Sequence, residues 1–250
     1  MIKQLLKRLL TGKGPAFSRL TAKECSIGDY RLKYQLPGNA IDIGIPKKPN
    51  PSHLNLNSDL FATYECDKEF NRTFVQMGFE WWAYRGFFLQ GSFGQLGRMS
   101  LHVDVNRAEP HTPLSEGDLD SLESYLKQEY WTYYETEETG GGINLRARQH
   151  YENNKVLIGD TPVSGFLVKL PDPYTKERIN GADWLSYHIN SEGMAGHHHT
   201  YYWAYPLNKD FYLTVSFWMQ LEIGNHAKRS ERLLDDARRI MSMMELYKSS

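Results

Sequence analysis

Alternation of apolar and polar residues predicts several half-buried strands in this chain. Residues 30–36, 99–106 and 211–221 place apolar side chains at nearly every second position, which is the period of a strand with one buried face. Residues 200–205 have the same character, and the segment 206–210 that follows them is rich in turn-forming residues. We therefore predict a hairpin over residues 200–221.

Shorter apolar or aromatic runs predict further strands. The Pro37-Gly38-Asn39 turn predicts that residues 30–36 form a hairpin with residues 41–45. Other strands are predicted at residues 60–66, 73–89, 143–150, 156–158, 166–170 and 184–189, and residues 171–183 are predicted to form a loop.

Helical spacing appears between and after these strands. Ser115 is a suitable N-cap, and the leucines and tyrosines that follow it keep helical spacing until the glycine run 140–142 ends the helix. After residue 225, an apolar stripe opposite charged residues predicts an amphipathic helix that runs to about Tyr247. This order predicts the α+β class: a mainly antiparallel sheet flanked by helices and closed by a C-terminal amphipathic helix.

The N-terminal segment is basic and rich in leucine. Residues 1–13 contain four basic residues and no acidic one, but Lys7 and Arg8 interrupt the apolar run that a signal peptide needs. Two interpretations remain open: a helix that docks on the domain, which we favour, and a basic amphipathic helix that touches a membrane surface. We expect residues 1–20 to form this helix or tail and residues 21–250 to form a single α+β domain.

Charge and cysteine content narrow the class of protein. The formal net charge of −1 argues against a nucleic-acid partner, because nucleic-acid-binding domains normally carry a basic excess. The two cysteines, Cys25 and Cys66, can form one disulfide or remain as thiols. We favour thiols in a reducing compartment and therefore expect a cytoplasmic protein.

A histidine run at residues 197–199 is the clearest candidate for metal binding. Successive side chains of an extended chain point to opposite faces, so His197 and His199 could share a metal ion. His102 and Asp104 alternate in another predicted strand and could complete the site. One alternative is therefore a metal-dependent enzyme built on these four residues.

Motifs for other chemistry are absent from the sequence. The glycine-containing segments TGKG (residues 11–14) and GSFGQLG (residues 91–97) lack the frame and the following helix of a phosphate-binding loop. No GxSxG motif occurs, and neither cysteine accompanies a histidine at a defined spacing. We expect no cofactor, and we favour a non-enzymatic protein over an enzyme.

Aromatic residues make up 13% of the chain and concentrate in the predicted strands. In the predicted hairpin, Tyr201, Trp203 and Tyr205 lie on one face, whereas Tyr212 and Trp218 lie on the nominally polar face of the partner strand. The simpler interpretation is that other layers cover both faces of the sheet. The alternative is that these five residues form an exposed binding surface, as clusters of Tyr and Trp often do.

Two segments of the chain resemble the PsbP-like α/β/α sandwich superfamily. The strand FYLTVSFWM (residues 211–219), followed by a turn and a helix ending in IMSMMEL (residues 240–246), resembles its C-terminal strand and helix. YRLKYQLPGNAIDIGIP (residues 30–46) resembles its first strand, proline turn and second strand. The resemblance covers roughly a third of the chain and includes no catalytic motif. It implies a non-enzymatic binding protein, since the superfamily includes bacterial immunity proteins and photosystem or envelope accessory proteins.

The leading hypothesis is a non-catalytic protein that binds another protein. If the chain is an immunity protein, that partner is a secreted bacterial toxin. The lack of a catalytic motif, the aromatic content and the resemblance motivate it. The alternatives are the metal-dependent enzyme and a peripheral membrane or envelope accessory protein that is tethered through residues 1–13.

Overall fold

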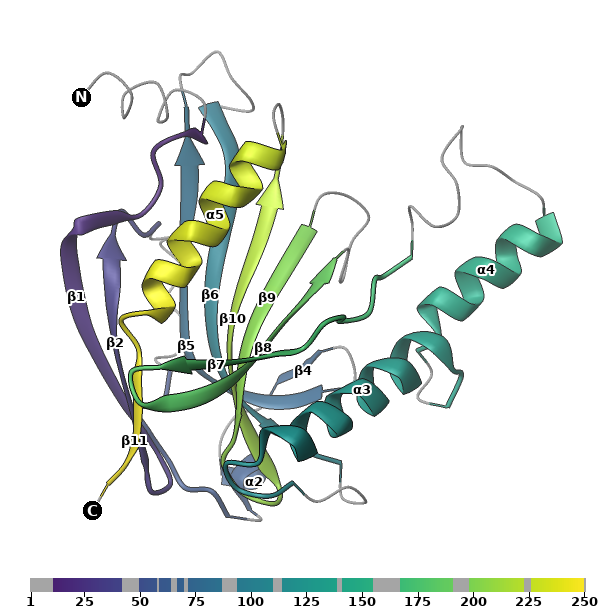
Figure 1. Cartoon of the computed structure of the whole chain (residues 1–250), viewed down its shortest axis with the longest axis horizontal. Coiled ribbons are helices and arrows are strands. Elements are labelled where there is room, and N and C mark those ends of the chain that lie inside the picture. Colours follow the sequence, from purple (N-terminus) through teal and green to yellow (C-terminus); the bar gives the residue numbers. More distant parts are fainter. Residues whose placement is uncertain are drawn as a thin grey trace.

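A computed structural model describes most of the chain (Figure 1). The described residues are 11–41, 50–57, 59–63, 67–69, 72–86, 94–109, 114–138, 141–154, 167–190, 198–222 and 226–249. Cys66, His197, residues 1–10 and the strand predicted at 156–158 lie outside them.

The helices and strands follow the labels of Figure 1. The strands are β1 (Ala16–Ile27), β2 (Tyr30–Gly38), β3 (His53–Leu54), β4 (Asp67–Glu69), β5 (Arg72–Arg85), β6 (Gln95–Arg107), β7 (Thr175–Ile179), β8 (Ala182–Asn190), β9 (His198–Pro206), β10 (Phe211–Leu221) and β11 (Glu245–Lys248). The helices are α2 (Leu60–Thr63), α3 (Leu119–Glu135), α4 (Ile143–Asn154) and α5 (His226–Met241).

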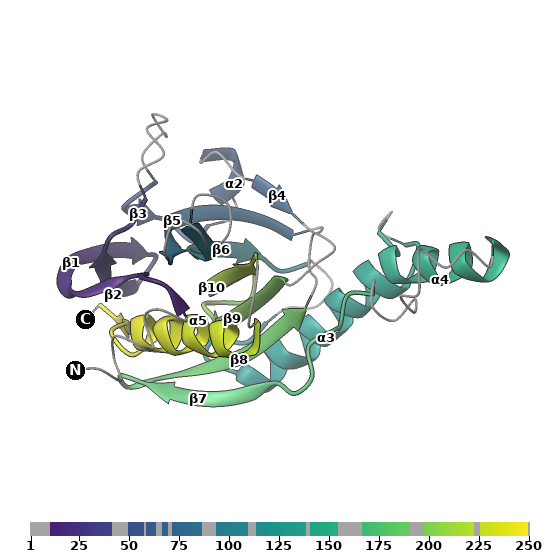
Figure 2. The same cartoon turned by 90° about the horizontal axis from the view of Figure 1, so that it is seen from above.

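A seven-stranded sheet forms the centre of the molecule (Figures 1 and 2). Its order is β4-β5-β6-β10-β9-β8-β7, and each neighbouring pair is antiparallel. β10 pairs with β6 along its whole length and with β9 along most of it. The predicted strands at residues 99–106, 184–189 and 211–221 and the predicted hairpin over residues 200–221 are confirmed.

A second sheet and α5 cover one face of the large sheet. The second sheet has the order β11-β2-β1-β3, in which the short β3 pairs with β1 in parallel. Leu32 of β2, Trp82 of β5, Phe217 of β10 and Ile240 of α5 are fully buried in the main core between these layers. Their burial removes large apolar side chains from water and stabilises the packing of the two sheets.

α3 covers the opposite face of the large sheet. Leu122, Leu126 and Tyr130 of α3 pack with Tyr187 of β8 and Tyr212 of β10 in a second core. The predicted α+β class, with an antiparallel sheet flanked by helices, is confirmed. The second sheet is a layer that the sequence pattern did not predict.

β2 confirms the strand predicted at residues 30–36, and it forms a hairpin with β1 through the two-residue turn Gly28-Asp29. Residues 42–45 of the predicted hairpin partner lie outside the described residues. Gly28 has a φ of 57°, as the first central position of such a tight turn requires. β1 begins at Ala16, so residues 16–20 belong to the sheet although they fall in the segment predicted as a helix or tail.

Two predicted strands are helical where the structure describes them. α2 occupies residues 60–63, because the N–H groups of Ala62 and Thr63 both donate to the carbonyl oxygen of Asp59. Residues 143–150 lie in α4. A short apolar run fits a strand and a helix equally well, so tertiary contacts decide between them.

The C-terminal helix is shorter than predicted. α5 ends at Met241, and β11 then pairs with β2. The side-chain amide of Asn180 donates to the carbonyl oxygens of Ser242 (2.9 Å) and Met244 (2.6 Å) and holds the chain in this new direction. Asn180 and Gly181 have φ values of 48° and 91° and form the turn between β7 and β8. The loop predicted at residues 171–183 is therefore wrong in part, because β7 lies within it and pairs with β8.

Cys25 is a free thiol buried in the main core. Burial is the largest cause that raises the pKa of this thiol, to about 12. Cys25 therefore stays protonated at neutral pH and acts as a small apolar side chain.

A buried carboxylate ties α5 to β5. The hydroxyl of Tyr84 donates to Oδ2 of Asp236 (2.9 Å), and Nε of Arg232 donates to the same oxygen (3.0 Å). Tyr84 is 1% exposed and Asp236 is 4% exposed. Burial raises the pKa of Asp236 and outweighs Arg232 and Tyr84, which lower it. The charged form of Asp236 is therefore stabilised in the core by both donors, Tyr84 and Arg232.

We predict that Tyr84→Phe lowers the free energy of unfolding by about 1–3 kcal/mol, because it removes one of two donors from a buried acceptor and keeps the ring. Urea denaturation measures this difference. Tyr151→Phe removes a hydroxyl from a side chain that is 37% exposed and should have an effect below about 0.5 kcal/mol. A Tyr84→Phe protein as stable as the wild type would contradict the expected role of the hydroxyl.

Candidate functional site

The structure buries two of the five aromatic residues predicted as a binding surface. Trp203 is 2% exposed in the main core, and Tyr212 is 0% exposed in the core under α3. Tyr201 and Tyr205 are partly buried against the main core, whereas Trp218 is partly buried on the opposite face of the sheet. The five residues therefore do not form one surface, and the simpler interpretation, that other layers cover both faces, describes this hairpin.

His102 lies at the centre of a polar cluster next to Trp218. The two rings stack with their centroids 4.9 Å apart, and the ring of Phe79 meets His102 edge-on at 5.0 Å. Oγ of Ser100 lies 3.0 Å from Nε2 of His102, and Nε2 of Gln76 lies 3.4 Å from Nδ1. Both ring nitrogens therefore have protein partners.

Strand register separates the residues predicted to bind metal. Met219 of β10 lies opposite Met99 of β6 and opposite His199 of β9, so these three side chains share the face of the main core. His102 and Asp104 lie three and five positions after Met99 and point to the other face. The sheet itself therefore stands between His199 and the other two candidate ligands.

The described part of the chain does not bring the predicted metal ligands together. Nδ1 of His199 lies 2.6 Å from Oδ1 of Asn190, and His197 is outside the described residues. In the part of the chain that the structure describes, no three His, Cys, Asp or Glu side chains form a group that could hold a metal ion. The membrane alternative depends on residues 1–13, most of which are not described; none of the described helices has the length and apolar character to cross a bilayer.

Exposed apolar side chains gather on α3 and α4 instead. Among the described residues, five large apolar side chains are exposed, and three of them lie here: Trp131 (55%), Ile143 (38%) and Tyr151 (37%). Figures 1 and 2 both show α4 continuing from the end of α3 and extending away from the sheets. We call these two helices and their connection the α3–α4 arm.

Glycine makes the joint of the α3–α4 arm. The N–H of Gly142 donates to the carbonyl oxygen of Tyr133 in the last turn of α3 (2.7 Å). A Cβ atom on Gly141 would lie 2.2 Å from that same oxygen, so no other residue fits there without moving the backbone. The first helix ends at Glu135, before the glycine run that was predicted to end it, and Gly141 and Gly142 directly precede α4.

Asn144 fixes the direction of α4. Asn144 is 1% exposed. Its side-chain amide donates to the carbonyl oxygen of Val168 (2.9 Å) and accepts from the N–H of Val168 (2.8 Å). It also donates to Glu135 at the end of α3 (2.8 Å), and Arg148 forms an ion pair with the same carboxylate. These contacts hold the arm to the body of the protein.

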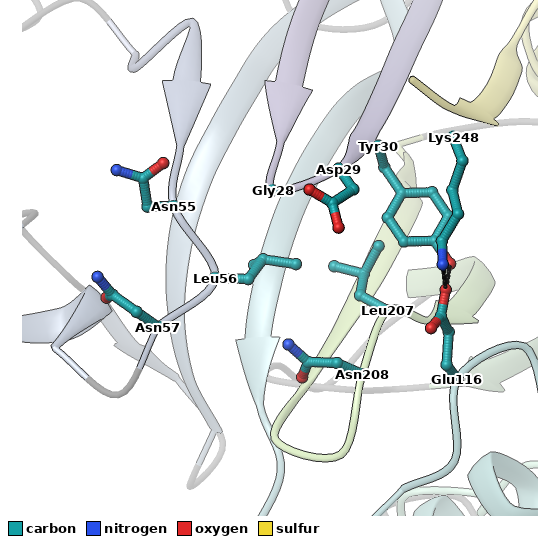
Figure 3. Close-up of a pocket in the computed structure, with 10 residues that line it drawn as sticks. All are labelled: Gly28, Asp29, Tyr30, Asn55, Leu56, Asn57, Glu116, Leu207, Asn208 and Lys248. Atoms are coloured by element: carbon teal, nitrogen blue, oxygen red, sulfur yellow. Dashed lines mark hydrogen bonds and ion pairs between the residues drawn. The ribbon is translucent and has the colours of Figure 1, made fainter. Parts of the chain in front are cut away.

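A pocket of about 350 Å³ is a second candidate site (Figure 3). It lies where the β1–β2 turn, the segment after β3, the loop before α3, the β9–β10 turn and the C-terminal strand meet. Its lining residues are Gly28, Asp29, Tyr30, Asn55, Leu56, Asn57, Glu116, Leu207, Asn208 and Lys248.

Glu116 forms the charged wall of this pocket. It accepts a hydrogen bond from the hydroxyl of Tyr30 and forms an ion pair with Nζ of Lys248. Lys248, and then Tyr30, lower the pKa of Glu116, and the bond to Glu116 raises the pKa of Lys248. Glu116 stands just before α3. The N-cap of this helix is Asp118 and not the predicted Ser115, because Oδ1 of Asp118 accepts a hydrogen bond from the backbone N–H of Asp120 (3.0 Å).

The pocket is suited to a polar group. Figure 3 shows Glu116, Tyr30 and Lys248 converging on one side, so the two charges satisfy each other. Asn55 and Asn208 also line the pocket, and their side-chain NH2 groups can donate hydrogen bonds to a bound group. Their Oδ1 atoms already have partners, His53 for Asn55 and the N–H groups of Asp210 and Phe211 for Asn208. Sequence patterns could not find this site, because its residues come from five separate segments.

No known protein-family model matches the chain, and no curated protein is significantly similar to it in sequence. The function is therefore inferred from the surfaces of the molecule itself.

We predict that Glu116→Gln lowers the free energy of unfolding at neutral pH, because the amide cannot form the ion pair with Lys248. The pKa of Glu116 is lowered in the folded state. The contribution of Glu116 to the free energy of unfolding is therefore present above the ordinary glutamate pKa of about 4.3 and is lost as the pH falls through the folded-state pKa. The pair is largely exposed, so the difference at neutral pH is small.

Denaturation at several pH values should show that the difference between the wild type and Glu116→Gln shrinks toward zero in acid. Glu137 is exposed and has no ion pair among the described residues, so Glu137→Gln is the control without this trend. A difference that stays constant with pH would contradict the prediction.

We also predict that Gly141→Ala loosens the α3–α4 arm and lowers the free energy of unfolding by about 1–3 kcal/mol, since the new methyl group collides with Tyr133. Hydrogen exchange of α4 should become faster. Gly38→Ala is the matched control, because a Cβ there comes no closer than 3.3 Å and meets the flexible side chain of Arg19. Equal protection of α4 in both variants would show that the joint tolerates the methyl group.

Proposed function

We propose that this chain is a non-catalytic protein that binds another protein through the α3–α4 arm. The observation that carries the proposal is Trp131, which is 55% exposed on a helix that packs its other side against the sheet. A tryptophan held on a rigid helix offers a large apolar contact at low entropic cost, and tryptophan is enriched among residues that dominate binding energy.

The surroundings of Trp131 support this proposal. Lys127 and Gln128 lie one turn before it and are exposed, so a polar rim borders the aromatic side chain. Ile143 and Tyr151 add exposed apolar area on α4, two helical turns apart. An apolar centre with a polar rim is the usual layout of a protein–protein interface.

The partner class that we propose is a secreted bacterial toxin, which the chain would neutralise as an immunity protein. The support for this class is the PsbP-like resemblance of residues 30–46 and 211–246. A projecting helical arm can also reach into a concave surface on a partner, which is how one protein blocks the active site of another. The choice of a toxin as the partner class depends on this resemblance of fold.

We predict that Trp131→Ala weakens capture of the partner at least about tenfold and leaves the fold stable, because the side chain contributes little to the core. The test is affinity capture from the native host with immobilised wild type and Trp131→Ala, quantified by mass spectrometry. Tyr247→Ala is the control, since Tyr247 is 39% exposed on β11, outside the arm.

A stoichiometric partner that the wild type and Tyr247→Ala retain, but Trp131→Ala loses, would support binding through the arm. Equal retention by all three proteins would contradict it. The toxin class is tested next: the purified partner should lose its activity when the chain is added in equal amount, and full activity would contradict that class.

A further inference from the structure

β1 is an edge strand along most of its length. β3 pairs with it only at Ser26 and Ile27, so no other described segment pairs with residues 16–25 on that side. Residues 18–24 are all exposed, and Figures 1 and 2 place β1 on the outer side of the molecule. A strand of this length with free backbone groups is a template for a further strand.

Hydrogen bonds at the end of β1 show which backbone groups are free. The N–H of Ser26 donates to the carbonyl oxygen of Ser52 (2.9 Å), away from β2. Backbone groups alternate sides along a strand, and the register between β1 and β2 is regular from Leu20 onward. The N–H and C=O groups of Leu20, Ala22 and Glu24 therefore point to the same open side as those of Ser26.

Two of the usual protections of an edge, proline and a bulge, are missing from this stretch. Residues 20–25 contain no proline, and the one irregularity in the β1–β2 register lies earlier, between Ala16 and Leu20. What remains are the charged side chains of Arg19, Lys23 and Glu24. Side chains of this kind limit which strands can pair with the edge, and in which register.

We propose that two copies of this chain pair through β1, antiparallel, about a twofold axis at Ala22. Each copy then places Leu20 opposite Glu24 of the second copy and Ala22 opposite Ala22 of the second copy. All three positions carry free N–H and C=O groups, so each facing pair exchanges two hydrogen bonds. The small side chain of Ala22 lets the two strands approach at the axis.

Charge selects this register over its neighbours. With the axis at Thr21, Lys23 would face Arg19 of the second copy, and with the axis at Lys23 the two Lys23 side chains would face each other. Like charges directly opposite each other in a sheet are destabilising. With the axis at Ala22, Lys23 faces Thr21 of the second copy, and no like charges are opposed.

Pairing through β1 leaves the α3–α4 arm free. Figure 1 shows β1 and α4 at opposite ends of the molecule. A dimer joined at β1 would therefore carry one arm at each end and could bind two partner molecules at once, which raises the effective affinity for a clustered partner. The pairing itself does not depend on what the arm binds.

Ala22→Pro tests the pairing through a single backbone group. The N–H of Ala22 points away from β2, so proline in both copies removes both hydrogen bonds of the central Ala22 pair and keeps the β1–β2 ladder, as edge strands allow. Ala22→Val keeps the N–H and is the matched control. Sedimentation velocity over a series of concentrations should show the wild type and Ala22→Val moving from a 29.0 kDa monomer toward a dimer, and Ala22→Pro remaining a monomer. A wild type that stays monomeric throughout, or an Ala22→Pro protein that dimerises like the wild type, would overturn the proposal.

Charge substitutions at Thr21 test the register of the pairing. They do not depend on whether the proline variant folds. Thr21→Glu puts a carboxylate opposite Lys23 of the second copy, twice by symmetry, and should tighten the dimer about 2- to 30-fold. Thr21→Lys should weaken it by a similar factor, and added salt should reduce both effects. Changes in the same direction for both variants would overturn the proposed register.

Discussion

Burial of β10 on both of its faces is the constraint on which the rest of the structure depends. The first seven residues of this strand, from Phe211 to Phe217, are all buried, although they alternate between the two faces of the sheet. A strand with apolar and aromatic side chains on both sides needs a layer on each side. α5 and the second sheet cover one face, and α3 covers the other.

This constraint also decides where aromatic residues can serve a function. Trp203 and Tyr212 are buried because the two covering layers close over the hairpin. Aromatic surface remains where the layers end, above all at Trp131, on the side of α3 that faces away from the sheet. The two binding surfaces that we propose, the α3–α4 arm and the edge of β1, both lie at the periphery of the molecule.

Regular alternation made much of the central sheet predictable from sequence. In β2, β6 and β10 the period of two is uninterrupted, and it reports which side chains share one face of the sheet whatever layer covers that face. The same periodicity could not place the candidate site. Tyr30 and Glu116 are 86 residues apart, and their contact arises only when α3 docks beside the second sheet.

The sequence by itself determined the α+β class, the β9–β10 hairpin and the amphipathic character of α5, because each depends on periodicity within one short segment. Only the tertiary structure decided that residues after Met241 leave the helix, since the amide of Asn180 captures Ser242 and Met244 from a distant turn. It likewise decided that β1 pairs with β2 and that α4 is a helix. Short segments have nearly equal local preferences for both states, so contacts from elsewhere in the chain set the outcome.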